Sequence, residues 1–217
     1  METVKYKAVI FDLDGVICHT DAYHYQAWKA LADRMDIYFD ETINNRLRGV
    51  SRMKSLEIIL EGNMGAALTD SEKQYLAEEK NNIYKKLLEN MGPGDLSNQV
   101  RQTLNILRGA GIKLAIGSSS KNAGFILKQI GLGGYFDAIS DGNNITRSKP
   151  DPEVFLMASE YLNIPKEDCL VVEDAAAGVD AAIAGGMDCA GIGDEMELKL
   201  ADYHLKNFND LLGIVLM

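Results

Sequence analysis

The sequence predicts an α/β protein whose core is a doubly wound parallel sheet, with an all-helical cap domain inserted after the first strand. Short apolar runs alternate with helical patterns over most of the chain, as they do in such sheets. The segment from residue 18 to residue 90 breaks this alternation, because it holds helical patterns and no convincing strand. We therefore expect a core of residues 1–17 and 91–217 and a cap of residues 18–90.

Five short runs have the length and the apolar composition of buried strands. They lie at Ala8–Phe11, Leu114–Gly117, Ala138–Ser140, Leu170–Val172 and Ala190–Ile192. Apolar residues at helical spacing fill three stretches between these runs, at 100–107, 125–130 and 153–162, and glycine or proline residues bound these stretches. Strands that alternate with helices in this way favour a parallel sheet.

Two helical patterns stand out in the inserted segment. One begins near Asp21 and places His24 and Trp28, four residues apart, on one face. The other begins with the capping box Thr69-Asp70-Ser71-Glu72. A lysine interrupts the apolar stripe of this second helix, and an ammonium in such a stripe is costly without a partner. The stripe consists of Leu76, Lys80, Ile83 and Leu87.

The composition excludes some classes of partner. The chain has 217 residues, 47% of them hydrophobic, and a net charge of −10, so it can form a core but lacks a basic surface for nucleic acid. No stretch is long and apolar enough for a membrane span or a signal peptide. Cys18, Cys169 and Cys189 have neither zinc-site nor disulfide spacing and favour a reducing compartment. We expect a cytoplasmic monomer that binds small molecules.

The most informative motif is Asp12-Leu13-Asp14-Gly15, which directly follows the first apolar run. Ligand chemistry in a parallel sheet collects beyond the carboxyl ends of the strands. Two carboxylates at such a point can serve a metal ion, a nucleophilic attack and a proton transfer. The alternative is a solvated turn that only ends the strand.

Three further polar groups occur near predicted strand ends. The turn Ser118-Ser119-Ser120-Lys121-Asn122 can bind an anion through hydroxyls and backbone N–H groups, although such turns are most often helix caps. Lys149 lies in a stiff turn and can aim a charge at a phosphoryl group, although a single lysine is usually a surface residue. Glu173 and Asp174 repel each other unless a cation lies near them. Mg²⁺ would suit Asp12, Asp174 and a main-chain carbonyl near Asp14.

These motifs, in this order and over essentially the whole chain, resemble those of the haloacid dehalogenase superfamily of phosphotransferases. The resemblance implies a Rossmann-like core, a helical cap and one Mg²⁺. It implies that Asp12 is the nucleophile that becomes an aspartyl phosphate, and that Asp14 is the general acid and base. It further implies that Ser118 and Lys149 hold the phosphoryl group. The metal site would consist of Asp12, Asp14, Glu173 and Asp174.

The cap segment resembles the sugar-phosphate mutases of this superfamily. The matching residues are Thr20, Tyr23–Trp28 with His24 and Trp28, Arg48, Gly49, Val50, Ser51, Arg52 and Ser55. This resemblance implies phosphoryl transfer between two hydroxyls of a sugar phosphate through a bisphosphate. Arg52 would hold the non-reacting phosphate, with help from Ser120, Lys121 and Asn122. Arg48 and Ser119 depart from the pattern of some relatives, which concerns substrate preference.

We also expect Thr20, His24 and Lys80 to couple closure of the cap to proton transfer by Asp14. Simple core packing is the alternative for His24 and Trp28, and a solvated charge is the alternative for Arg52. Two other functions stay open. One is a phosphatase of the same fold, acting on a sugar phosphate or phosphoglycolate. The other is a sugar-phosphate sensor without catalysis, which the presence of both Asp12 and Asp14 disfavours.

Overall fold

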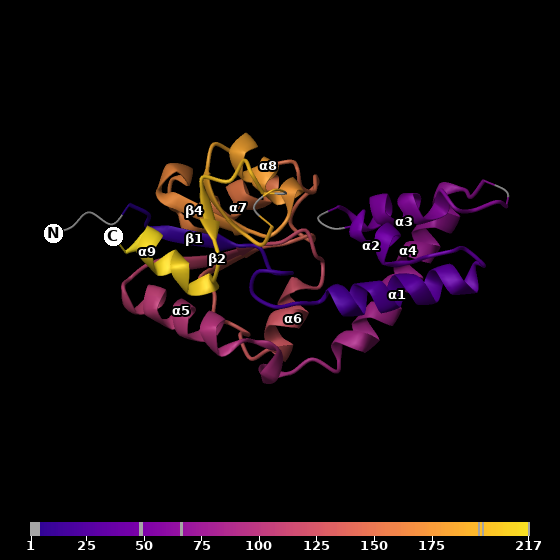
Figure 1. Ribbon diagram of the computed structural model, residues 1–217, viewed down its shortest axis with the longest axis horizontal. Coiled ribbons are helices and arrows are strands. Elements are labelled where there is room, and N and C mark those ends of the chain that lie inside the picture. Colours follow the sequence, from indigo (N-terminus) through magenta and orange to yellow (C-terminus); the bar gives the residue numbers. More distant parts are fainter. Residues whose placement is uncertain (1–4, 48–49, 66, 195, 197, 217) are drawn as a thin grey trace. The chain divides into compact units, whose positions relative to one another are not determined.

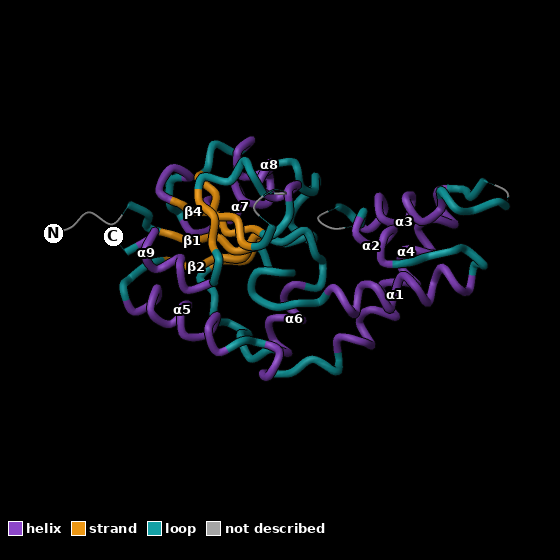
Figure 2. Tube along the Cα trace, in the orientation of Figure 1, coloured by secondary structure: helices purple, strands orange, loops and turns teal. Residues whose placement is uncertain are grey.

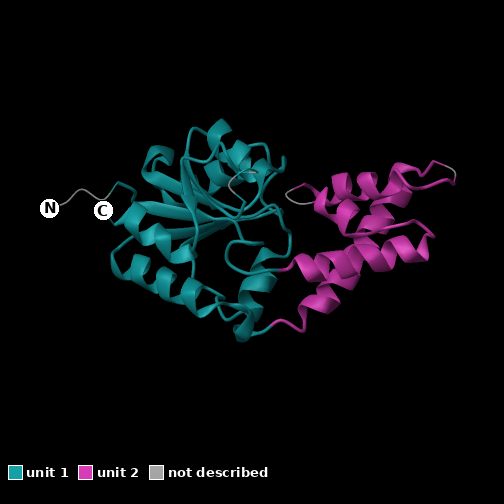
Figure 3. Ribbon diagram, viewed as in Figure 1, with its two compact units in different colours: residues 1–19, 92–217 teal, residues 20–91 magenta. Residues whose placement is uncertain are grey.

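The computed structural model describes residues 5–47, 50–65, 67–194, 196 and 198–216. The chain divides into two compact units, one of residues 1–19 and 92–217 and the other of residues 20–91 (Figure 3). These boundaries fall one or two residues later than those expected from the sequence. The first unit holds the sheet, and the second holds helices.

The first unit contains a six-stranded parallel sheet in the order β3-β2-β1-β4-β5-β6 (Figure 1). Its strands are β1 (Ala8–Phe11), β2 (Lys113–Gly117), β3 (Ala138–Ser140), β4 (Cys169–Glu173), β5 (Asp188–Ile192) and β6 (Tyr203–Leu205). The first five are the predicted strands, extended by at most two residues at either end. The sequence did not predict β6, because this three-residue edge strand buries only Leu205 and has no apolar run.

The central strand β1 sets the position of the polar residues that follow it. All four of its residues are buried, and it pairs with β2 on one side and with β4 on the other. Its last residue, Phe11, lies opposite both Ile116 and Val172. The residues that come next in each strand therefore share one edge of the sheet. This register brings Asp12 and Glu173 together.

Helices cover both faces of the sheet, as a doubly wound fold requires (Figure 1). Figure 1 shows α5 (Asn98–Gly109) and α6 (Ala123–Gln129) on one side, and α7 (Glu153–Leu162) and α8 (Ala176–Ala184) on the other. From α7 and α8, Phe155 and Val179 pack in one cluster with Ile10 and Ala115 of the sheet. The predicted fold class is confirmed. The other helical segments described in the first unit are α9 (Leu211–Val215) and the 3₁₀ turns Pro93–Asp95, Lys166–Asp168 and Phe208–Asp210.

The second unit consists of α1 (Asp21–Arg34), α2 (Glu41–Asn45), α3 (Arg52–Leu60) and α4 (Asp70–Leu88) (Figure 2). Its apolar cluster is drawn from all of these helices except the short α2, whose Ile43 packs at the edge. The predicted capping box opens α4: the Glu72 N–H donates to Thr69 Oγ1, and the Thr69 N–H donates to the Glu72 carboxylate.

None of the helices in the described part of the chain is long and apolar enough to cross a membrane.

The buried face of α4 differs slightly from the stripe that the sequence indicated. Lys80 is buried as expected, but Ile83 and Leu87 are only half-buried. The residues one position further along, Tyr84 and Leu88, are buried instead. Since α4 packs closely against α1, the positions four residues apart form the contacting ridge.

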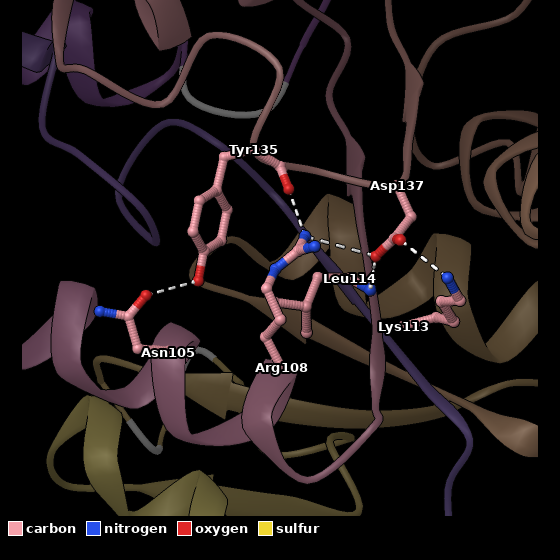
Figure 4. Close-up of polar contacts among 6 residues, drawn as sticks. All are labelled: Asn105, Arg108, Lys113, Leu114, Tyr135 and Asp137. Atoms are coloured by element: carbon pink, nitrogen blue, oxygen red, sulfur yellow. Dashed lines mark hydrogen bonds and ion pairs between the residues drawn. The ribbon is translucent and has the colours of Figure 1, made fainter.

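A network of polar contacts lies at the amino ends of β2 and β3 (Figure 4). The Asp137 carboxylate accepts hydrogen bonds from Lys113 Nζ at 2.9 Å and from the Leu114 N–H at 3.0 Å. Arg108 Nη2 lies 3.4 Å from the same carboxylate and donates to the main-chain oxygen of Tyr135. The Arg108 guanidinium also lies over the Tyr135 ring, 4.5 Å from its centroid. This network ties α5 to the loop before β3.

Candidate active site

Three charged side chains meet beyond the carboxyl ends of β1 and β4. Asp12 is the first residue after β1, Glu173 ends β4, and Lys149 lies in the turn before α7, where its bond to Pro150 is cis. Lys149 Nζ donates to Asp12 Oδ1 and, at 2.5 Å, to Glu173 Oε1. All three residues are buried. The fold thus holds one ammonium between two carboxylates, largely shielded from bulk water.

Glu173 is fixed at both of its carboxylate oxygens. While Oε1 accepts from Lys149, Oε2 accepts from the N–H groups of Asp174 at 2.8 Å and of Ala175 at 2.9 Å. Gly178 provides the space, because a Cβ atom there would lie 1.8 Å from Glu173 Oε1. The first contribution of Glu173 is therefore to position Lys149, and its predicted metal ligation stays a prediction.

Burial and charge act against each other in this group. Burial raises the pKa of the Asp12 carboxyl well above its ordinary value, and the Lys149 ammonium opposes this rise. Burial alone would lower the pKa of Lys149, but the charges of Asp12 and Glu173 outweigh it and raise that pKa. Lys149 therefore stays protonated. Its Nζ also lies 4.6 Å from the centroid of the Phe155 ring.

The loop after Asp12 approaches Asp174 closely at a glycine. Gly15 has a φ of +92°, and a Cβ atom built on it would lie 2.1 Å from Asp174 Oδ2. A side chain at position 15 would thus be strained and would also collide with the Asp174 carboxylate. The negative charges of Asp14, Glu173 and Asp174 all raise the pKa of the Asp12 carboxyl, which places the four predicted carboxylates in one electrostatic cluster.

The donor set of this cluster fits Mg²⁺. Within the described residues, no three His, Cys, Asp or Glu side chains form a preassembled metal site. Magnesium is usually bound through one or two carboxylates, with water and substrate phosphate oxygens completing its octahedron. Asp12 and Asp174, with main-chain oxygen from the segment around Asp14, supply that kind of hard ligand. A divalent ion would also offset the excess of negative charge over the single Lys149 ammonium.

The serine-rich turn after β2 is organised by its own hydroxyls. The buried Ser118 Oγ accepts from the Ser120 N–H at 3.1 Å, and Ser120 Oγ accepts from the Asn122 N–H at 3.2 Å. Ser119 Oγ is a buried hydroxyl for which the described residues provide no hydrogen-bond partner. Lys121 is exposed, and Asn122 is buried next to the start of α6. The helix-cap interpretation and the anion-site interpretation are both compatible with this geometry.

In the second unit, the structure brings together predicted residues from α1 and α4. Lys80 Nζ lies 2.8 Å from His24 Nδ1 and 4.6 Å from the centroid of the Trp28 ring. Lys80 and Trp28 are each 2% exposed. Burial lowers the pKa of His24 well below its ordinary value, and the charge of Lys80 lowers it further. Thr20, which is fully buried, precedes α1 and accepts the His24 N–H at its main-chain oxygen.

The other predicted cap residues lie at the start of α3. Arg52 is its first residue and donates to Asn81 Oδ1 at 2.9 Å, with Glu78 at 3.5 Å. Ser51 caps the helix by accepting the Lys54 N–H at 3.3 Å. Val50 packs at the edge of the apolar cluster, and Ser55 is buried. Two predicted substrate-binding residues, Arg48 and Gly49, lie outside the described residues.

A family model described as haloacid dehalogenase-like hydrolase matches residues 6–186, which is most of the chain. The chain belongs to the haloacid dehalogenase-like hydrolase family. The superfamily predicted from the sequence is confirmed, and membership makes the chain an enzyme.

Within this family, the chain is similar to mutases and to phosphatases. A β-phosphoglucomutase from Bacillus subtilis (strain 168) is 41% identical over 206 residues, which cover 94% of this chain and 91% of that protein. A crystal structure of β-phosphoglucomutase from Clostridium difficile has a TM-score of 0.89 and 40% identity, covering 95% of this chain and 93% of that one. A phosphorylated carbohydrates phosphatase from Thermotoga maritima is 32% identical over 184 residues, 84% of this chain and 82% of that protein.

Several residues that contact the predicted site residues were not identified from the sequence, among them Tyr84, Asn81 and Phe155. Tyr84 stacks on His24, and its signal was available, because it lies four residues after Lys80. Asn81 binds Arg52 and directly follows Lys80. Phe155, which lies beneath Lys149, looked like any other apolar residue of a core helix. Only the packing of α7 against the sheet reveals its position.

Proposed function

We propose that this chain is a β-phosphoglucomutase. It interconverts β-D-glucose 1-phosphate and glucose 6-phosphate through a phosphoryl group on Asp12 and through β-glucose 1,6-bisphosphate. The observation that carries the proposal is the buried Asp12–Lys149–Glu173 group beyond β1, in a chain 41% identical to a β-phosphoglucomutase over nearly its whole length.

Asp12 attacks phosphorus with the carboxylate oxygen that Lys149 holds in place. The new O–P bond forms as the bond from phosphorus to the sugar oxygen breaks. Lys149 stays protonated and offsets negative charge on the equatorial oxygens of the phosphoryl group. Ser118, one step beyond β2, adds a hydroxyl donor to these oxygens.

Asp14 supplies the proton transfers. It gives a proton to the departing sugar oxygen, and it removes one from the hydroxyl that next attacks the Asp12 phosphate. Such help is typically worth about 10²–10⁴-fold in rate. Asp14 suits this role because it is half-exposed and lies two residues after the nucleophile. The next residue, Gly15, lets this loop approach Asp174 closely.

Mg²⁺ is the metal ion that this site would hold, through Asp12, Asp174 and main-chain oxygen near Asp14, with Glu173 contributing as the sequence implied. When bound, the ion neutralises the charge of the phosphoryl oxygens. Glu173 also has a role that needs no metal, because it shares the Lys149 ammonium with Asp12.

The cap residues favour a sugar hydroxyl over water as the acceptor. Arg52 holds the phosphate that is not reacting, with Ser120, Lys121 and Asn122 as further donors to phosphate. Thr20, His24 and Lys80 make the position of Asp14 depend on bound sugar phosphate. Trp28, Arg48, Gly49, Val50, Ser51, Ser55 and Ser119 complete the proposed substrate contacts.

A ³¹P NMR assay tests the proposal. Purified protein with Mg²⁺, β-glucose 1-phosphate and a trace of β-glucose 1,6-bisphosphate is expected to yield glucose 6-phosphate, with little inorganic phosphate. The Asp12→Asn variant is the control for contaminating activity. Release of free phosphate as the main product would instead support a sugar-phosphate phosphatase, the alternative that the similarity to the Thermotoga maritima protein favours.

We infer that the protein works as a cytoplasmic monomer on small sugar phosphates. Its net charge of −10 disfavours nucleic acid and anionic membranes as partners. Size-exclusion chromatography with light scattering is expected to give a mass near 23.8 kDa. A mass of about twice that value would contradict the monomer.

A further inference from the structure

Four side chains of α1 and α4 interlock within the second unit. His24 and Trp28 lie four residues apart on α1, and Lys80 and Tyr84 lie four residues apart on α4. Each pair therefore occupies one face of its helix. Lys80 contacts each of the other three through a hydrogen bond or a cation–π contact, and His24 stacks on Tyr84.

Tyr84 contacts both partners of the hydrogen bond in this group. Its ring stacks on the His24 imidazole, with the centroids 4.1 Å apart and the planes inclined by 29°. Lys80 Nζ lies 4.6 Å from the centroid of the same ring. Trp28 presents a second ring to Lys80, also at 4.6 Å. Lys80 thus has two aromatic neighbours, of which Tyr84 also contacts the imidazole.

The hydrogen bond fixes the proton of the imidazole. A lysine ammonium has three donors and no acceptor, so His24 Nδ1, 2.8 Å away, must accept. The imidazole proton then resides on Nε2. The charges of Lys80 on α4 and of Arg52 on α3 both disfavour a second proton on His24, and burial disfavours it most. A neutral ring with one defined N–H follows, provided that Lys80 keeps its place.

The aromatic rings of Trp28 and Tyr84 help to keep Lys80 in place. Lys80 is 2% exposed, so its ammonium has exchanged most of its contacts with water for contacts with the protein. The negative face of an aromatic ring attracts a cation at this distance, and it does so more strongly where water is excluded. A saturated side chain of similar size offers no such face.

We infer that Tyr84 is a positioning residue whose ring holds the Lys80 ammonium against His24 Nδ1 and so keeps His24 in its Nε2–H form. The inference rests on the proposed mutase function only for its effect on turnover. The contacts that define it lie within one unit, and they use the ring face of Tyr84.

Variants of two tyrosines on α4 separate the ring face from general packing. Tyr84→Leu removes the aromatic face, and Tyr84→Phe retains it. Tyr75→Leu makes the same change as Tyr84→Leu at a position that is 70% exposed on the same helix. If Tyr84→Leu does not fold, Tyr84→Met fills similar space with a flexible side chain and answers the same question.

The first measurement is the ¹⁵N NMR spectrum of the histidine rings near neutral pH. The chain has three histidines, and His24→Gln identifies the His24 signals. We expect His24 to show an unprotonated Nδ1 and a protonated Nε2 in the wild type, in Tyr84→Phe and in Tyr75→Leu. Tyr84→Leu is expected to show a mixture of the two tautomers. An unchanged His24 spectrum in a folded Tyr84→Leu variant would overturn the inference.

The second measurement is steady-state conversion of β-glucose 1-phosphate. Tyr84→Leu is expected to lower kcat by about tenfold or more, with a smaller change in KM, because misplaced groups cost rate more than binding. Tyr84→Phe should restore most of this loss. Equal losses in Tyr84→Phe and Tyr84→Leu would overturn the inference, because they would assign the effect to the phenol hydroxyl.

The two proposals fail separately. If the protein releases phosphate and forms no glucose 6-phosphate, the proposed function fails, and the ¹⁵N spectra still decide the role of Tyr84. If conversion proceeds and the tautomer of His24 does not depend on the ring at position 84, only the present inference fails.

Discussion

The two ends of the parallel sheet use charge in opposite ways. At the amino ends of the strands, exposed lysines pair with aspartates across neighbouring strands: Lys7 with Asp168 at 2.7 Å, and Lys113 with Asp137 at 2.9 Å. At the carboxyl ends, acidic residues gather around one buried lysine, Lys149. One end of the sheet is neutralised by surface pairs, and the other keeps an excess of negative charge.

The difference separates stability from chemistry. Exposed ion pairs contribute little, with a median of about 0–1 kcal/mol each, and they need no special packing. Buried charges of like sign cost free energy unless a cation is shared among them. At the carboxyl end, the single Lys149 ammonium does not balance all of the nearby carboxylates, so an unfavourable electrostatic free energy remains there. A bound ligand or metal ion would offset it. The variants in the next four predictions alter one end of the sheet or the other.

The largest effect is expected at the nucleophile. Asp12→Asn should lower mutase turnover by at least about 10⁴-fold, because an amide cannot form the phosphoryl intermediate. The amide oxygen can still accept from Lys149, so the free energy of unfolding should change by less than about 1 kcal/mol. ³¹P NMR and urea denaturation measure the two quantities. Substantial residual turnover in Asp12→Asn would contradict the assignment of the nucleophile.

Removal of the shared cation should cost both activity and stability. Lys149→Met leaves two buried carboxylates without their ammonium, which typically lowers the free energy of unfolding by about 3–5 kcal/mol. Lys128→Met, at an exposed position of α6, should stay within about 0.5 kcal/mol of the wild type. Urea denaturation in EDTA compares them. Equal stabilities of the two variants would show that Lys149 does not neutralise the carboxyl end.

The close packing at Glu173 predicts a contrast between two glycines. In Gly178→Ala, the new Cβ atom would collide with Glu173 Oε1, so we expect a loss of about 1–3 kcal/mol, together with lower turnover as Lys149 shifts. Gly124→Ala, with open space around it in α6, should be neutral or stabilising by up to about 1 kcal/mol. Thermal denaturation ranks the pair. A lower melting temperature in both variants, by similar amounts, would contradict the packing argument.

The smallest effect is expected at the amino end. Burial works toward a higher pKa for Asp137, but the Leu114 N–H and the charges of Lys113 and Arg108 outweigh it and hold that pKa below 3.8. A depressed folded-state pKa stabilises above the unfolded value and is lost as pH falls through the folded one. Asp137→Asn should therefore cost up to about 1 kcal/mol at pH 7 and less below pH 3.8, with turnover unchanged.

Urea denaturation of Asp137→Asn and the wild type at pH 7 and at pH 3 measures this difference. A gap between the two proteins that widens in acid would contradict the sign. Reduced turnover in Asp137→Asn would show that the two ends of the sheet are not independent.

Much of the fold could be predicted from local pattern, because buried strands and amphipathic helices leave periodic signals. The five inner strands and the capping box at Thr69 are examples. Tyr203–Leu205 left no such signal, because an edge strand needs only one buried face. The stripe of α4 was read one residue off at Ile83 and Leu87, since the ridge that packs on α1 is a property of two helices.

The site was predictable in residue type but not in contact. The order of Asp12, Ser118, Lys149 and Glu173 along the chain predicts a phosphoryl-transfer site, and the roles of these residues stay predictions. That Glu173 uses both oxygens, one on Lys149 and one on the start of α8, depends on a three-dimensional fit at Gly178. The stacking of Tyr84 on His24 likewise depends on how two helices meet. Sequence spacing alone places such residues on faces and does not pair them.

The burial of Lys149 gives the protein a built-in reporter. Reagents that acylate amines require an accessible and unprotonated nitrogen, and the Lys149 side chain is 3% exposed with its pKa raised by two carboxylates. Lys7, whose side chain is 67% exposed, should be labelled long before it. Detection of an adduct on Lys149 by mass spectrometry would then show when the carboxyl edge of the sheet opens.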